Sequence, residues 1–459
     1  MIHNDKFINE IVKQGAHLEA DLADMEVRNV AREDNNIQLV WETFKKDVKR
    51  ITKTMMKTLH YKINSWITAL KKDRKELIQD PRADIDDNIR TNETHLAKEI
   101  TYLVRKWAKN TKETLSAALA DHEEKLGGVW LAMSKEKKPR NLIYRLKIPS
   151  TKHYEQNSKK MAELTRNYHK SLQEDNLRDA NLDNFELGMT TLLERIPEEQ
   201  ILQEPELSLL NWPLNRLHME KALHHTKNRS VTGMDGCPYK LWKALKTCYE
   251  ETTQMNKPKF NIMKVLMELY ADIQSFGIDQ RTSFALGWMC PIYKKKDPTE
   301  ISNYHPITLL NTDYNILTKI LAIQLMNHIQ QLIHQDQAGF IPRRSILNQI
   351  RLAKAIICYA DATQEDGAIV ALDQEKAYDK IRHNYLWETL QAFNLPPPFI
   401  NTIQALYQNA STQVIINGVL SKHLQVTRGI WQGNPISCPC IDLVIELLAC
   451  MINWKKTLT

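Results

Sequence analysis

The feature that most constrains the fold is the stretch between residues 16 and 80, which contains neither glycine nor proline. Helix interiors exclude proline and disfavour glycine, so a stretch free of both can continue as one helix. Its large apolar side chains recur at steps of three and four residues, the spacing of one helical face. They are Trp41, Phe44, Val48, Ile51, Met55, Leu59, Ile63, Trp66 and Leu70. The pattern predicts a long amphipathic helix whose apolar stripe belongs to a protein core.

A second apolar stripe follows beyond Pro81, where the first helix is expected to end. Two neighbouring amphipathic helices can bury their stripes against each other as an antiparallel hairpin or coiled coil. We therefore expect residues 1–200 to form a basic helical region made of this helix pair and a linker. The second stripe consists of Leu96, Ile100, Leu103 and Trp107.

Six cations of the first helix are candidates for contacts with a nucleic-acid backbone. Proteins that bind such backbones neutralise the phosphates with lysine and arginine. Exposed helix faces are also rich in lysine simply because they are solvated. The sequence leaves both interpretations open. The six residues are Lys45, Lys46, Lys49, Arg50, Lys53 and Lys57.

Residues 201–459 have a different character, because nine of the 13 glycines lie after residue 230. Short apolar runs typical of strands, Trp288–Tyr293 and Ala368–Leu372, alternate with helical stretches. Two alternating runs within Thr412–Val426 flank Asn417 and Gly418, a pair suited to the positive φ values of a type I′ turn, and predict a hairpin. The expected fold class is α+β and rich in helix.

The composition limits the cellular locations expected for the protein but does not determine its function. The sequence carries 62 Lys and Arg against 55 Asp and Glu, and the net charge of +7 suits a polyanionic partner but is common in unrelated proteins. The seven cysteines lack the paired spacing of zinc sites and disulfide frameworks. No run approaches the ~20 apolar residues of a membrane span, and the start lacks a secretion signal. We expect an intracellular protein of the nucleus or cytoplasm, neither secreted nor in a membrane.

The central chemical feature is Asp373, which follows the apolar run Ala368–Leu372 and precedes a helical segment. A strand that ends on a carboxylate presents it at the rim of a sheet, where it can bind a metal ion. Taken alone, such an aspartate is more often the cap of a helix. The residues around Asp373 decide between these interpretations.

Residues 368–379 resemble the first palm motif of the reverse transcriptases of non-LTR (LINE-like) retrotransposons. That motif has an apolar strand, an aspartate, three residues, an alanine, an aromatic residue and a second aspartate, and the sequence A-I-V-A-L-D-Q-E-K-A-Y-D matches every position. Four further blocks occur in the order of the family, three before this motif and one after it. They read G-M-D-G-C-P at 233–238, P-I-Y-K-K-K-D and N-Y-H-P-I-T-L-L between 291 and 310, Q-A-G-F-I-P at 337–342, and G-I-W-Q-G-N-P-I-S at 429–437.

The resemblance implies a fold and roles for individual residues. Residues 201–459 would form the fingers and a partial palm of a right-hand polymerase. Asp373 would bind the catalytic Mg²⁺ ions, and Tyr378 would lie under the sugar of the incoming nucleotide as a steric gate, whereas Asp379 would be structural. An RNA template and a DNA primer are the implied partners, and the oligomeric state is left open. The remaining nucleotide-binding candidates are Lys295, His305, Gln432 and Gly433.

The resemblance also implies an incomplete metal site. Nucleotide addition uses two metal ions, which need several carboxylates. The family supplies the others from an aromatic-Ala-Asp-Asp hairpin, which does not appear before the sequence ends at Thr459. The sequence Tyr-Ala-Asp-Ala from Tyr359 is no substitute, because it precedes Asp373, has one aspartate and belongs to a helical stretch. We therefore expect an inactive polymerase fragment that lacks the catalytic hairpin and the thumb.

Single differences from the family pattern favour the same expectation. The family's triphosphate-binding arginine is replaced by His305, whose imidazole lacks the bidentate fork of a guanidinium. The family sequence Arg-Gln-Gly-Asp appears as Trp431-Gln-Gly-Asn434. Two alternatives remain open. One is a non-enzymatic protein that binds nucleic acid or a partner through its long helices, and the other is an active polymerase whose missing strands come from another chain.

Overall fold

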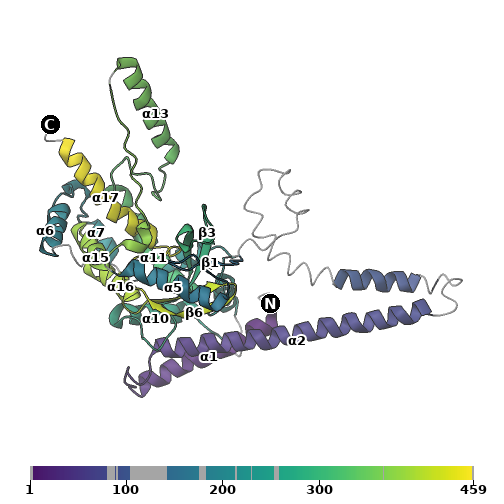
Figure 1. Ribbon diagram of the computed structural model, residues 1–459. Coiled ribbons are helices and arrows are strands. Elements are labelled where there is room, and N and C mark those ends of the chain that lie inside the picture. The colour runs from purple at the N-terminus through teal and green to yellow at the C-terminus, as the bar shows by residue number, and fades with distance from the viewer. Residues whose placement is uncertain are drawn as a thin grey trace. The chain divides into compact units, whose positions relative to one another are not determined.

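The protein is described by a computed structural model that covers residues 4–79, 88, 91–103, 142–174, 182–211, 214–228, 230–252, 258–364 and 366–456. It is an α+β fold rich in helix, as expected (Figure 1). The helices are α1 (Asp5–Val27), α2 (Ile37–Gln79), α5 (Ser158–Gln173), α6 (Leu182–Leu193), α7 (Glu206–Asn211), α8 (Arg216–His224), α9 (Tyr239–Glu251), α10 (Ile262–Phe276), α11 (Thr312–Met326), α12 (Ile329–Leu332), α13 (Ile346–Thr363), α14 (Ala377–Lys380), α15 (His383–Ala392), α16 (Pro397–Gln408) and α17 (Ser437–Lys456). The strands are β1 (Leu146–Lys147), β2 (Tyr154–Glu155), β3 (Leu286–Tyr293), β4 (Tyr304–Leu309), β5 (Ser411–Ile416) and β6 (Val419–Gln425).

The chain divides into two compact units. One contains residues 1–11 and 46–140, and the other contains residues 12–45 and 141–459. This division differs from the expected boundary between residues 200 and 201, because residues 12–45 and 141–200 belong to the same unit as the second half. No helix in the described ranges is long and apolar enough to cross a membrane. All seven cysteines are free thiols.

The first unit contains the expected antiparallel helix pair. Residues 91–103 are helical and bury Ile100 and Leu103 against Leu70 of α2. The ion pair between Arg74 and Glu93, 2.6 Å from Nε to Oε1, lies further along the pair, as an antiparallel arrangement requires. Trp107 lies outside the described residues. The long helix is confirmed, although Trp66 of its stripe is 51% exposed.

The second unit contains a four-stranded sheet in the order β4-β3-β5-β6. Strand β3 pairs antiparallel with β4 and parallel with β5, and β5 and β6 form the predicted hairpin. Asn417 and Gly418 adopt φ values of 51° and 83° at its turn. The Asn417 amide also accepts from the Ile143 N–H (3.0 Å) and donates to the Ile143 carbonyl (2.8 Å), so this residue fixes both the turn and an upstream segment.

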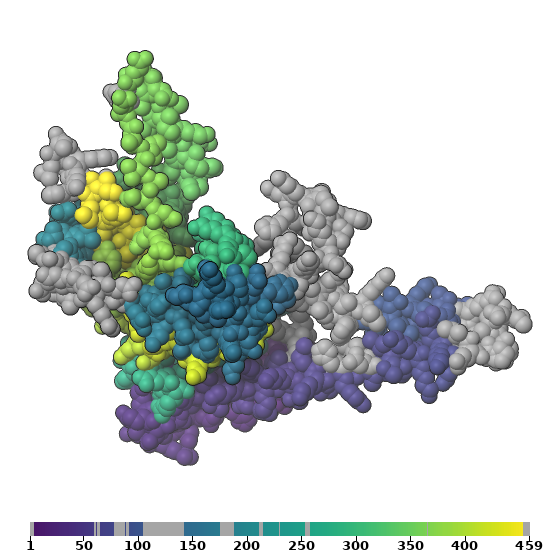
Figure 2. Space-filling model, viewed as in Figure 1, coloured from purple at the N-terminus to yellow at the C-terminus, as the bar shows by residue number. Residues whose placement is uncertain are grey.

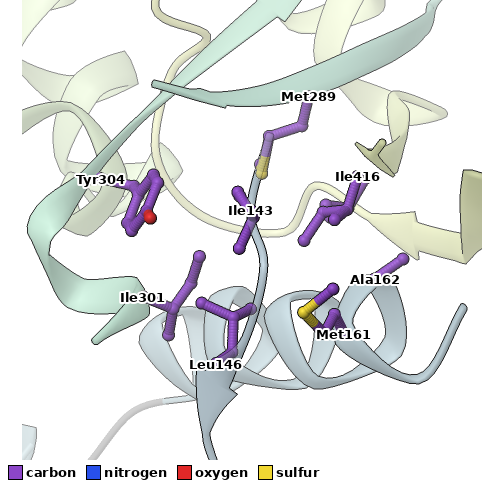
Figure 3. Close-up of a cluster of buried hydrophobic side chains, with 9 residues drawn as sticks. Ile143, Leu146, Met161, Ala162, Met289, Ile301, Tyr304 and Ile416 are labelled. Atoms are coloured by element: carbon purple, nitrogen blue, oxygen red, sulfur yellow. The ribbon is translucent and has the colours of Figure 1, made fainter. Parts of the chain in front are cut away.

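Helix α5 packs on β5 and β6 and closes an apolar core. Figure 3 shows Met161 and Ala162 of this helix facing Met289 of β3 and Ile416 of β5, with Ile143 between them. These segments are far apart in the sequence, so residues 143–162 and the sheet share one core.

The expected strand Ala368–Leu372 is not part of the sheet. Residues 366–374 have no strand partner in the described part of the chain, and Ile369, Val370 and Leu372 are 71%, 77% and 73% exposed. The preceding helix α13 buries none of its side chains. Figure 2 shows this segment in green, standing away from the rest of its unit. The prediction of a strand at a sheet rim is therefore wrong, because an apolar run becomes a strand only when its backbone groups find a partner.

Candidate nucleotide-binding site

Three separate segments of the second unit meet through their backbones. The Thr308 N–H of β4 donates to the Gln432 carbonyl oxygen at 2.9 Å. The Gly429 N–H donates to the Ile381 carbonyl (2.7 Å), and the Ile430 N–H donates to the Tyr378 carbonyl (2.8 Å). Residues 428–433 thus bridge strand β4 and the segment that contains α14. We call residues 428–433 the bridging loop.

Two glycines allow this close approach. Gly429 has a φ of 79°, and a Cβ there would lie 2.7 Å from the carbonyl oxygens of Tyr378 and Asp379. Gly433 has a φ of 107°, and a Cβ there would lie 3.0 Å from the Thr308 carbonyl oxygen. Only glycine adopts these backbone angles without strain while leaving the space free. The bridging loop therefore needs glycine at both positions.

A cavity lies where the three segments and helix α5 meet. Sequence reasoning identified Tyr378 and Gln432, and the structure brings both into the lining of this cavity. The contribution of α5 was not predicted from the sequence. Nothing in the residue pattern of this helix shows which of its side chains line a cavity together with residues more than 200 positions further along the chain. The lining also includes His169, Gln173, Pro306, Thr308, Asp379, Arg428, Gly429 and Trp431.

Burial sets the protonation of the groups around the cavity. The pKa of Asp379 is raised to about 6 by burial, although Lys376 and Lys380 act in the opposite direction. The Oδ2 atom of Asp379 is buried without a hydrogen-bond partner among the described residues. Burial also lowers the pKa of His169 to about 4, so this imidazole is neutral at physiological pH. Burial likewise raises the pKa of Tyr378, whose hydroxyl lies 3.7 Å from the Cys438 sulfur.

Lys376 anchors α14 to the sheet and was also missed. Its backbone has a φ of 53°, and its ammonium donates to the carbonyls of Ser302 (2.9 Å) and of Tyr304 (3.3 Å), the first residue of β4. The ammonium also lies 5.9 Å from the centre of the Tyr168 ring on α5. This lysine therefore fixes the position of Tyr378, which lies two residues further along the chain.

Three of the expected nucleotide-binding residues, Lys295, His305 and Gly433, do not line the cavity. His305 is exposed on β4, next to Pro306, which lines the cavity, and neighbouring residues of a strand point to opposite faces. Partial burial lowers the pKa of His305, and Lys294 and Lys376 lower it further, so protonation of the imidazole is disfavoured. Lys295 is exposed in the segment that follows β3.

Asp373 stands apart from these groups. It is exposed at the end of the segment that has no strand partner. Within the described ranges, no cluster of three or more His, Cys, Asp or Glu side chains could hold a metal ion. The donor set therefore does not fit the two-metal site that the sequence resemblance implies.

The expected row of basic residues on α2 needs one correction. Lys45 is 3% exposed, and its ammonium lies 2.9 Å from Asp313 Oδ2 and 3.4 Å from Asp235 Oδ2. It cannot reach a phosphate because its charge is enclosed. The other five cations, Lys46, Lys49, Arg50, Lys53 and Lys57, are exposed.

Comparisons with known proteins place this site in a family. Residues 293–457 match the family described as reverse transcriptase (RNA-dependent DNA polymerase). An uncharacterized 149 kDa protein of transposon TX1 from Xenopus laevis is 37% identical over 36% of this chain and 12% of its own length. The Pol polyprotein of retrotransposable element R2DM from Drosophila melanogaster is 26% identical over 32% of this chain and 14% of its own length.

A third relative matches a longer part of the chain. The Pol polyprotein of retrotransposable element R2 from Bradysia coprophila is 22% identical over 53% of this chain and 25% of its own length. The chain thus spans a quarter or less of the length of these relatives. The matched region contains β4, α14 and the bridging loop, the three segments that meet at the cavity. Residues 293–457 are therefore a reverse transcriptase domain of the non-LTR retrotransposon type.

Proposed function

We propose that this domain binds an RNA template, a DNA primer and an incoming nucleotide, but that the chain by itself does not add nucleotides. The observation that carries the first part is the bridging loop, which joins β4 and the Tyr378 segment around one cavity. The lining of this cavity, whose volume is only about 30 Å³, includes Tyr378, Gln432 and Arg428. In our proposal these residues would contact the sugar, the base edge and a phosphate of a nucleotide bound against the cavity.

The second part of the proposal rests on the carboxylates. Transfer of a nucleotidyl group needs divalent ions to stabilise the attacking and leaving oxygens, and several carboxylates to hold those ions. Asp373 is exposed and has no carboxylate cluster around it in the described part of the chain. The further ligands would have to come from outside the described residues, for example from another chain.

Primer extension with the purified chain, a template–primer and Mg²⁺ tests this proposal. We expect the template–primer to bind without incorporation of nucleotides. Incorporation that Asp373→Ala abolishes would overturn the inactivity and favour a complete site. Failure to bind template–primer at all would overturn the first part.

A second candidate function is binding of nucleic acid by α2, favoured by the five exposed cations that follow Lys45. The logarithm of the affinity falls linearly with the logarithm of the salt concentration, and each phosphate contact makes this slope steeper by roughly 0.7 to 0.9. Replacement of Lys46, Lys49, Arg50, Lys53 and Lys57 by glutamine should weaken binding and flatten this slope, without any requirement for Mg²⁺. Unchanged affinity and slope would show that these residues are only solvated. We also propose an intracellular location, as the cysteine spacing of the sequence suggests.

A further inference from the structure

A second cleft lies in the same unit, and its lining includes residues 425–427, which lead into the bridging loop. It has a volume of about 640 Å³, within the range of small-molecule sites. Helices α15 and α16 pack on each other and α16 packs on α10, as Figure 1 shows, and the end of β6 completes the wall. Val426 lines both this cleft and the nucleotide cavity, so the two are neighbours.

One wall of the cleft is aromatic. The ring centres of Trp387 and His383 are 5.7 Å apart, and those of Trp387 and Tyr407 are 6.3 Å apart. The position of His383 is fixed, because its Nε2 is 2.8 Å from the Gly429 carbonyl oxygen of the bridging loop. Trp387 is only half-buried, and its indole N–H makes no hydrogen bond to the described residues. The neighbouring rings thus hold the indole in place, and its N–H can donate a hydrogen bond to a ligand.

The lining also carries amide side chains that make no hydrogen bond to the described residues. Asn401, Gln404 and Gln408 of α16 are spaced by three and four residues and share one helical face. The apolar residues of α16 lie on its other face and are buried. Gln425, at the end of β6, adds a fourth amide. None of these four side chains makes a hydrogen bond within the described part of the chain, so their donors and acceptors are available to a ligand.

The lining of the cleft contains no charged side chain. A charged ligand would lose its hydration without gaining a counter-ion, which is unfavourable. A suitable ligand is planar, uncharged and bordered by both donors and acceptors. Nucleobases have these properties: they stack on aromatic side chains, and asparagine and glutamine amides pair with their edges.

We propose that this cleft binds an unpaired base of a single-stranded nucleic acid, whose chain continues past Val426 toward the nucleotide cavity. The strand is held by stacking on Trp387 and by the amide row of α16. This site requires no metal ion and no nucleotide addition. It can therefore be tested separately from the proposed polymerase function.

The test uses the full chain and short fluorescent single strands of RNA and DNA, with fluorescence anisotropy as the readout. Stacking of one base on an aromatic side chain contributes enough that Trp387→Ala should weaken binding roughly five- to 150-fold. Trp387→Phe should retain most of the affinity. Because the lining carries no charge, the fold-change should be the same at low and high salt. An oligonucleotide without bases should bind equally to both proteins.

Two further variants guard against a loss of folding. Gln404→Ala and Gln408→Ala alter side chains that are not buried, and each should weaken binding several-fold. Gln156→Ala, at an exposed glutamine on another part of the unit, is the matched control and should have no effect. Trp66→Ala is the corresponding control for an exposed aromatic residue of α2.

Photo-crosslinking of an RNA that contains 4-thiouridine locates the base directly. We expect the crosslinked peptides to include Trp387 or residues 401–408. Crosslinks confined to other segments, or equal affinity of Trp387→Ala and Gln404→Ala with the unaltered chain, would overturn the proposal. Competition experiments give a further test. Displacement of the RNA from this cleft by a peptide, but not by an unrelated single strand of nucleic acid, would also overturn the proposal.

Discussion

Replacement of Lys45 by methionine should be among the most destabilising changes in the second unit. The Lys45 ammonium lies 2.9 Å from Asp313 Oδ2, which also accepts a hydrogen bond of 2.7 Å from the Trp41 indole. Lys45 is 3% exposed and Asp313 is fully buried. Methionine keeps the apolar stem but leaves the carboxylates of Asp313 and Asp235 without their cation. Removal of one partner of a buried ion pair costs about 3–5 kcal/mol.

The pH dependence gives this prediction a second signature. Burial raises the pKa of Asp235 to about 6, and Lys45 holds it below the value that burial alone would give. A carboxyl group with a raised pKa stabilises the fold fully below its unfolded pKa, and this contribution is lost as pH rises through the folded pKa. Without Lys45 the pKa of Asp235 rises further. The destabilisation by Lys45→Met should therefore be larger at about pH 8 than at about pH 5.

Urea unfolding followed by tryptophan fluorescence measures both effects, since Trp41 and Trp242 are buried with ring centres 5.5 Å apart. Lys46→Met is the matched control, because this neighbouring lysine is exposed and should change stability by less than about 0.5 kcal/mol. Equal effects of the two substitutions, or no dependence on pH, would refute the account of the buried ion network.

Three further predictions follow from the site and its surroundings. Gly429→Ala should destabilise the second unit by more than the roughly 1–3 kcal/mol of backbone strain alone, because its Cβ would lie 2.7 Å from the Tyr378 carbonyl. Gly236→Ala, which has a similar φ of 74° and no neighbour within 4 Å, should show the strain only, and equal urea midpoints would contradict this reasoning. The raised pKa of Asp379, about 6, means that its carboxyl group costs stability as pH rises from below 4 through 6. Asp379→Asn should therefore stabilise the chain at about pH 8 and have little effect at about pH 4, and thermal melts at both pH values would reveal the opposite trend if the carboxylate were paired. Ile369→Lys, in an exposed apolar segment, should raise solubility in ultracentrifugation assays without changing the melting temperature, whereas a lower melting temperature would show that this side chain is packed.

Local patterns predicted the features that local physics controls. The helix α2 follows from a stretch without glycine or proline and from its apolar spacing. The β5–β6 hairpin follows from Asn417 and Gly418, which adopt the positive φ values that the turn requires. Tyr378 and Gln432 were found through the family motifs, and the structure places both at one cavity.

Features that depend on distant partners were not predictable in this way. Lys45 was grouped with exposed lysines, although it follows Trp41 by four residues and precedes Val48 by three and so lies on the buried stripe. That spacing was a usable signal, but the partner Asp313 is 268 positions away. The cavity residues of α5 have no local signal. The strand expected at 368–372 depended on a pairing partner that the described chain does not supply.

The most direct test of the central claim is to find where a nucleotide binds. A photoreactive deoxynucleoside triphosphate can be crosslinked to the purified chain in the presence of a template–primer, and the labelled peptides identified by mass spectrometry. We expect labels in residues 376–382 and in the bridging loop, 428–433, the two segments joined around the cavity. Labels found only on other segments would contradict the assignment of this cavity as the nucleotide site.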